Sequence, residues 1–251
     1  MFPRPKGGGT PTKNRMMKNV LQSPAGEGGI QENNKLRLRF EKTGRAVYIS
    51  HLDLMRTMQR AFQRAGFSLK YSEGFNPHPQ LSILLPLGVG CASRCELMDF
   101  RLREEAGLET LPERLDAALP EGIRALEVYP AARKARELKW LKIDGLLEYD
   151  GRDAEELCAP LRDFFARESL VIRKKTKRGE GETDIAPAVR EIIFEAAEGG
   201  VCVHAVLSAQ EPTASPEHLL LALRQLAPVL APDFASFTRC ETYAADMTVF
   251  R

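Results

Sequence analysis

The order in which strand and helix patterns follow one another constrains the fold of this chain more than any other feature. Runs that alternate apolar and polar residues, typical of strands, are interrupted by amphipathic runs with helical periodicity. In the first half the patterns predict a first strand at 36–40 that resumes at 46–49, and further strands at 81–85, 96–103 and 123–129. They predict helices at 50–65 and 108–119. The order then begins again, with strands at 141–149, 170–177, 191–194, 200–209 and 237–244, and helices at 153–167 and 215–226.

This β-α-β-β-α-β order is typical of the ferredoxin-like fold, in which two helices cover one face of an antiparallel sheet. We therefore expect an α+β protein made of two tandem ferredoxin-like domains, at residues 35–131 and 141–251. Residues 132–140 are predicted to be a basic connector. Residues 1–34 contain a run of glycines and several basic side chains but no periodicity, which predicts a disordered basic tail.

The first helix carries both a capping signal and a row of arginines. Ser50 precedes the periodic run and Asp53 follows three residues later, which is the spacing of a capping box. Arg56, Arg60 and Arg64 recur every four residues and therefore share a face. Such a row is usually a solvated surface, but it also predicts a site for anions such as the phosphates of RNA.

Two histidines flank this helix. His51 lies in the first turn, where the helix dipole disfavours imidazolium, so its ring should be neutral and able to accept a proton or bind a metal. His78 stands between Pro77 and Pro79, which fix the backbone on either side of it. His51, Asp53 and His78 are therefore the candidate catalytic residues. The alternatives are an exposed helix start, a capping acid and a purely structural turn.

The other candidate RNA-binding residues lie in a loop and in a hairpin. Phe75 and Asn76 precede His78, and Phe75 is placed either to stack on a base or to plug the loop onto the core. The second-half strand and its hairpin carry five basic residues: Arg173, Lys174, Lys175, Lys177 and Arg178. A basic hairpin can follow a phosphate backbone, but lysines also blunt an exposed edge strand.

Charge and composition narrow the remaining possibilities. The 36 basic and 34 acidic residues give a net charge of +2, so RNA binding would have to come from local clusters. We expect no membrane partner, because no apolar run is long enough for a membrane span. Five scattered cysteines are typical of reduced thiols in a cytoplasmic protein. Cys91 and Cys95 have no further ligand nearby, so neither a metal nor a cofactor is predicted.

Several motifs resemble the radical-SAM-linked protein family. They are SHLDLMRTMQRAFQRAG, YSEGFNPHP, LGVG and ELMDFRL in the first half, and KKTKRG, DIAP and TRCETYA in the second. Members of that family occur fused to or encoded beside radical SAM proteins, often near genes for a ribonuclease and ribosomal proteins. The resemblance therefore implies a radical SAM partner and a role around RNA or a ribosomal component. This chain lacks the C-x3-C-x2-C motif, so it does not itself hold a radical SAM iron–sulfur cluster.

Two functions follow from these patterns. The first is an accessory protein linked to a radical SAM enzyme, which binds structured RNA (rRNA or tRNA) and presents it for modification or processing. The alternative is a small hydrolase or phosphodiesterase that uses His51 and His78 as acid and base or as metal ligands. Proximity of these two histidines in the folded chain would favour the alternative.

Overall fold

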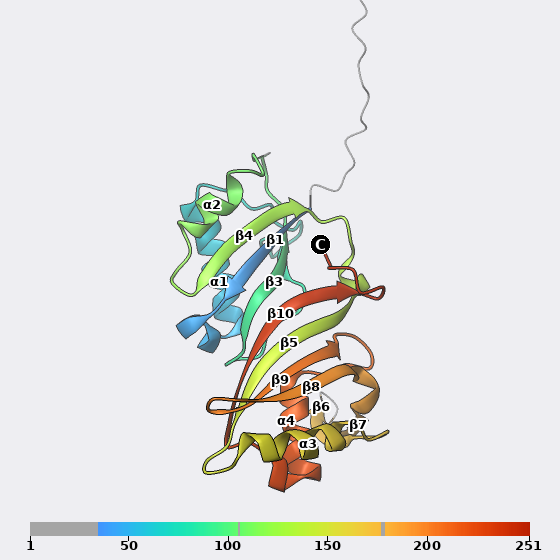
Figure 1. Cartoon of the computed structure of the whole chain (residues 1–251). Coiled ribbons are helices and arrows are strands. Elements are labelled where there is room, and N and C mark those ends of the chain that lie inside the picture. The colour runs from blue at the N-terminus through green and yellow to red at the C-terminus, as the bar shows by residue number, and fades with distance from the viewer. Residues whose placement is uncertain (1–34, 105, 177–178) are drawn as a thin grey trace, which may run out of the picture. The chain divides into compact units, whose positions relative to one another are not determined.

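A mostly antiparallel sheet of eight strands runs through both halves of the chain (Figure 1). The structure, a computed structural model, describes residues 35–104, 106–176 and 179–251. The predicted tail at 1–34 lies outside the described residues, as do Lys177 and Arg178. The described residues belong to one compact unit. The fold is thus mixed α/β, with a large sheet and few helices.

The first half contributes four strands and two helices. In chain order these are β1 (Leu36–Lys42), α1 (His51–Arg64), β2 (Leu81–Ile83), β3 (Ala92–Phe100), α2 (Leu111–Asp116) and β4 (Ile123–Pro130). A short 3-10 helix, η1 (Gly44–Tyr48), connects β1 to α1, and another, η2 (Ala135–Glu137), leads into the second half.

The second half contributes six strands and two helices. They are β5 (Leu138–Glu148), α3 (Ala154–Phe165), β6 (Val171–Thr176), β7 (Gly179–Asp184), β8 (Val189–Ala197), β9 (Gly200–Ser208), α4 (Pro216–Leu226) and β10 (Phe234–Ala244). The 3-10 helices η3 (Ala186–Ala188) and η4 (Pro228–Leu230) precede β8 and follow α4. Strands β6 and β7 form a separate two-stranded hairpin.

The strands of the large sheet follow the order β4-β1-β3-β10-β5-β9-β8, with β2 also paired to β3. All described pairings are antiparallel except that of β3 with β10. The parallel pairing joins the two halves and is short, since it matches only Ala92 with Thr238 and Ser93 with Arg239. Two tandem ferredoxin-like domains stay a prediction, because one sheet contains the strands of both halves.

Strand alternation decides which side chains enter the core. Leu38 and Phe40 of β1 are fully buried beside Leu54 and Phe62 of α1. Arg37 directly precedes Leu38 in β1 and therefore faces the opposite side of the sheet. A second apolar cluster lies under α3 and α4, so each half has its own core.

Several element boundaries differ from the sequence predictions. Residues 46–49, predicted as a continuation of the first strand, belong largely to η1, whose turn closes through a hydrogen bond from Ala46 N–H to the Thr43 carbonyl. Helix α2 is shorter than predicted and stops well before Pro120. Strand β3 begins earlier than predicted because its first residues pair with β10. That pairing lies far along the sequence and leaves no local pattern.

A buried ion pair reinforces the junction of the two halves. Arg239 of β10 donates to the Glu96 carboxylate of β3 at 2.8 Å and to the Leu85 carbonyl at 2.9 Å. Glu96 is fully buried and Arg239 is 8% exposed, so each charge depends on the other for solvation. The thiol of Cys95 in turn contacts the Arg239 carbonyl at 3.7 Å.

None of the helices in the described part of the chain has the length and apolar character that crossing a membrane requires.

Replacing Glu96 with Ala should lower the free energy of unfolding by about 3–5 kcal/mol, because the Arg239 guanidinium would stay buried without a counter-charge. Urea denaturation followed by circular dichroism measures the change. The double variant Glu96→Leu/Arg239→Met removes both charges and should recover most of the loss. A Glu96→Ala variant as stable as the parent would show that the pair does not stabilise the junction.

Candidate nucleic-acid groove

Ser50 and Asp53 fix the start of α1. The Ser50 hydroxyl accepts the Asp53 N–H at 3.1 Å and donates to the Asp53 carboxylate at 2.7 Å. Arg56 lies 3.3 Å from the other carboxylate oxygen. The hydrogen bond from Ser50, followed by the contact with Arg56, holds the pKa of the Asp53 carboxyl below its usual value. The predicted N-cap at Ser50 is confirmed, whereas the Asp53 carboxylate binds the Ser50 hydroxyl instead of completing the capping box through a backbone N–H.

Helix α1 ends at Arg64 with Ala65 as its C-cap, and Gly66 follows as the helix stop that the sequence predicts. The backbone of Gly66 has a φ of +76°, a conformation that favours glycine. The Phe67 N–H donates to the Phe62 carbonyl at 2.8 Å, which is the six-to-one bond of a Schellman motif. A Cβ at Gly66 would lie 3.1 Å from the Arg114 guanidinium, so glycine also suits the packing. The turn sends the chain back alongside α1.

The returning segment, residues 67–71, is held in place by the chain that follows β3. Leu69 forms an antiparallel bridge with Leu102, and the Arg103 N–H donates to the Ser68 carbonyl at 2.9 Å. The Arg103 guanidinium lies over the Tyr71 ring, 5.9 Å from its centroid. The segment is therefore a fixed wall facing the helix.

The loop at 72–78 is closed at its base by Ser72 and His78. The Ser72 N–H donates to the His78 carbonyl at 2.8 Å, and the Ser72 hydroxyl oxygen accepts the His78 N–H at 3.1 Å. The same hydroxyl lies 3.0 Å from the His78 ring nitrogen Nδ1. Next to this closure Tyr71 pairs with Pro79. Phe75, at the tip of the loop, is fully exposed (111%), so its side chain does not pack against the core.

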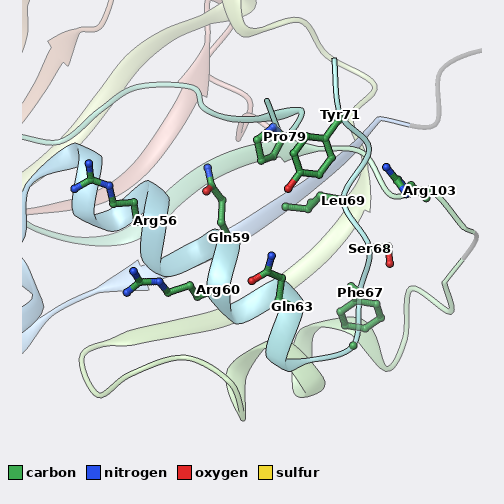
Figure 2. A pocket seen from close by; sticks show the side chains of 11 residues that line it. Arg56, Gln59, Arg60, Gln63, Phe67, Ser68, Leu69, Tyr71, Pro79 and Arg103 are labelled. Carbon is green, nitrogen blue, oxygen red and sulfur yellow. The ribbon is translucent and has the colours of Figure 1, made fainter. Parts of the chain in front are cut away.

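A groove of about 640 Å³ lies between α1 and the returning segment (Figure 2). The helix lines it with Arg56, Gln59, Arg60 and Gln63. The opposite side includes Leu69, Tyr71, Pro79 and Arg103. Figure 2 shows the two glutamines on the side of the helix that faces Tyr71 and Leu69. Three guanidinium groups border the groove, and no acidic side chain does so among the described residues.

The third arginine of the α1 row has a different position. Arg64 donates to the Ala118 carbonyl at the end of α2, at 2.5 and 3.3 Å from its two nitrogens. Arg114 of α2 donates to the Ala65 carbonyl at the end of α1, at 2.6 Å. Each helix thus supplies a cation to the other's C-terminal carbonyls, which the helix dipole favours. Arg64 therefore joins the two helices rather than lining the groove.

The two candidate catalytic histidines share no cavity among the described residues. His51 is exposed at the first turn of α1. His78 lines a separate hollow of about 420 Å³, together with Gln80 and Asp99. Asp99 is already held by buried Arg37 at 2.7 Å. Within the described ranges, no three His, Cys, Asp or Glu side chains are grouped as a metal site would require.

The basic hairpin lies in the second half, whereas every residue that lines the groove comes from the first. The Gln225 side chain of α4 bonds the backbone N–H and carbonyl of Arg173, both at 2.8 Å, so β6 is attached to this helix (Figure 1). The Arg173 guanidinium is 3.1 Å from Glu182 of β7. Strand register also places Lys175 opposite Glu180. Lys174 lies 3.5 Å from the His218 ring.

Of the residues that line the groove, only Arg56 and Arg60 were among the sequence candidates; those not predicted include Gln59, Gln63, Tyr71 and Arg103. The two glutamines lie three residues after Arg56 and Arg60, on the same side of the helix, so helical spacing alone could have found them. Tyr71 and Arg103 had no such signal. Their positions depend on the pairing of segment 67–71 with the chain beyond β3.

Replacing Ser50 with Ala should raise the pKa of Asp53, because the hydroxyl that stabilises its carboxylate is lost. A carboxyl whose pKa is depressed in the folded state stabilises the fold above its unfolded pKa, and this stabilisation disappears as the pH falls through the folded value. A carbon-detected NMR titration of the Asp53 carboxyl measures the change. An equal pKa in both proteins would contradict the assigned hydrogen bond.

The chain matches the model of a protein family. The model of the family described as "Uncharacterized protein conserved in bacteria (DUF2344)" matches residues 35–216, which include α1, the loop at 72–78 and the groove. No curated protein matches the chain. Because the family match covers well over half of its residues, this protein belongs to the DUF2344 family of proteins conserved in bacteria.

Proposed function

We propose that the groove between α1 and residues 67–71 binds RNA. The observation that carries this proposal is the set of three arginines, Arg56, Arg60 and Arg103, that border the groove. Among the described residues, no acidic side chain lines it. Guanidinium groups bind phosphate oxygens through two parallel hydrogen bonds. Asp53, which lies outside the groove, offsets part of the charge of Arg56. Arg60 and Arg103 are therefore the strongest ligands that the groove offers to an anion.

The uncharged side chains of the groove support RNA over a small inorganic anion. Gln59 and Gln63 offer both hydrogen-bond donors and acceptors, which base edges and the ribose 2′-hydroxyl require. Tyr71 supplies an aromatic ring beside Arg103. A volume of about 640 Å³ is within the usual range of ligand sites and exceeds the needs of a single phosphate.

The wider role that we propose is that of an accessory protein. In this role the protein binds structured RNA (rRNA or tRNA) in the cytoplasm and presents it to a radical SAM enzyme for modification or processing. The partner and the location rest on the resemblance of the SHLD and GFNPHP motifs to the radical-SAM-linked family and on the reduced-thiol composition. Affinity purification of the tagged protein from its native cell tests this role. Recovery without any radical SAM protein would remove the partner from the proposal.

We also propose that each half has a ferredoxin-like topology. The first half has the strand order β4-β1-β3-β2 and the second has β10-β5-β9-β8, which is the same order when each half is numbered separately. In both halves a helix follows the first strand and another precedes the last. The β6–β7 hairpin is then an insertion between α3 and β8.

A phosphodiesterase is the second candidate, because Ser72 orients the His78 ring at the edge of a hollow. His78 would act as the acid or base, with His51 as its proposed partner. Incubation of labelled RNA with the protein, with His78→Ala as control, tests this activity. Cleavage that persists in His78→Ala, or no cleavage by either protein, would remove this candidate.

The triple variant Arg56→Ser/Arg60→Ser/Arg103→Ser should bind bulk tRNA and ribosomal RNA more weakly and with less dependence on salt. If each arginine contacts one phosphate, the slope of log K against log salt should flatten by about 2 units, at about 0.7 per contact on single strands. Filter binding at several salt concentrations measures both quantities. Arg162→Ser, which removes an exposed charge from α3, is the matched control. Equal slopes for parent and triple variant would refute RNA binding in the groove.

A further inference from the structure

The groove has a shape that accepts one strand more readily than two. It lies between a helix and a returning segment, and its volume of about 640 Å³ is that of a site for one or two nucleotides rather than for a double helix. Double-stranded RNA is recognised mostly across a broad, shallow surface by its overall shape. A concave site lined by arginines and glutamines instead suits a single RNA strand whose bases are unpaired.

The loop beside the groove presents an aromatic ring without a partner in the core. Phe75 has the largest exposed fraction, 111%, among the exposed large apolar side chains of the described residues. An exposed phenylalanine costs solvation and gives no packing energy to the fold. Unpaired bases stack on such rings.

The base of the loop that carries the ring is held before any ligand binds. Ser72 and His78 close the loop through reciprocal backbone and side-chain hydrogen bonds, and Pro77 and Pro79 restrict the backbone near them. A loop whose backbone is already closed at its base loses less conformational entropy when a base stacks on its aromatic ring. The loop thus has the rigidity that a stacking platform needs.

Phe75 is also within reach of the groove. It follows Tyr71, which lines the groove, by four positions in the chain, so their Cα atoms are at most about 14 Å apart. Tyr71 and Pro79 pair at the base of the loop and are both part of the groove wall. One strand of a few nucleotides can therefore contact the arginines and the exposed ring together.

We propose that the ligand of this site is an unpaired segment of RNA, whose phosphates bind Arg60 and Arg103 in the groove while one base stacks on Phe75. This inference rests on the proposed RNA-binding function and specifies the part of a structured RNA that is bound. The loop motif GFNPHP, which the RNA-binding proposal leaves largely unused, then has a role: it holds the aromatic platform.

The test compares a short single-stranded RNA of mixed sequence with the duplex that it forms with its complement, by fluorescence anisotropy. The parent protein should bind the single strand at least about tenfold more tightly. Phe75→Ala should reduce affinity for the single strand by about 5- to 100-fold, as expected for the loss of one stacked base, and should leave the weak duplex binding unchanged. Phe234→Ala removes another exposed phenylalanine, from β10, and is the matched control.

Phe75→Trp gives a direct measure of stacking. The chain contains one tryptophan, Trp140, so the parent protein provides the fluorescence background. Addition of the single strand should quench the new tryptophan and leave Trp140 of the parent unchanged. This readout also shows that the loop variant is folded and binds.

The outcomes separate this inference from the proposed function. Equal binding of single strand and duplex, or full affinity in Phe75→Ala without quenching in Phe75→Trp, would overturn the unpaired-RNA inference, even if the arginine triple variant still loses affinity. Unchanged binding in the arginine triple variant would overturn the RNA-binding groove itself. Preference for the single strand, loss in Phe75→Ala and quenching in Phe75→Trp together would support both.

Discussion

The buried ion pair between Arg239 and Glu96 lies at the junction on which the arrangement of the two halves depends. The junction also contains an apolar cluster shared by the halves, with Leu97 of β3 and Leu141 of β5. Each half has its own apolar core, and only two matched residue pairs join β3 to β10. So short a ladder offers little register information of its own. We expect the pair to favour one alignment of the halves, because an alignment that left either charge buried without its partner would be strongly destabilised.

The site depends on a second constraint, the fixed relation between α1 and the chain that returns beside it. Gly66 reverses the chain, and the reciprocal bonds of Arg64 and Arg114 attach α1 to α2. The groove arginines extend from this attached helix, so their spacing is set by the fold before a ligand arrives. Such preorganisation favours binding because less freedom remains to be lost.

The sequence was informative where the determining signal is local. The cap at Ser50, the stop at Gly66 and most of the order of strands and helices could be predicted, because each depends on neighbouring residues or on periodicity. Strand β7 (Gly179–Asp184) was not predicted, because its polar sequence has no apolar alternation. The continuous sheet could not be predicted, since the pairing of β3 with β10 joins residues far apart in the chain. For the same reason, Arg103 and Tyr71 could not be predicted as part of the candidate site. The arginine row itself has two roles: Arg64 donates to the Ala118 carbonyl after α2, whereas Arg56 and Arg60 border the groove. This division depends on contacts between α1 and α2 that helical spacing does not reveal.

One edge of β3 serves two strands at once. Its last residues, Met98 to Phe100, pair with β2, and its first, Ala92 and Ser93, pair with β10 on the same side. Strand β2 begins only two residues after Pro79, so the groove loop leads straight into this shared edge. Because β2 is short, the start of β3 stays available to pair with β10 of the second half. Strands β2 and β10 compete for one row of backbone hydrogen bonds on β3. A longer β2, extended toward the start of β3, would displace β10. The edge that the two strands share therefore couples the groove loop to the second half of the chain.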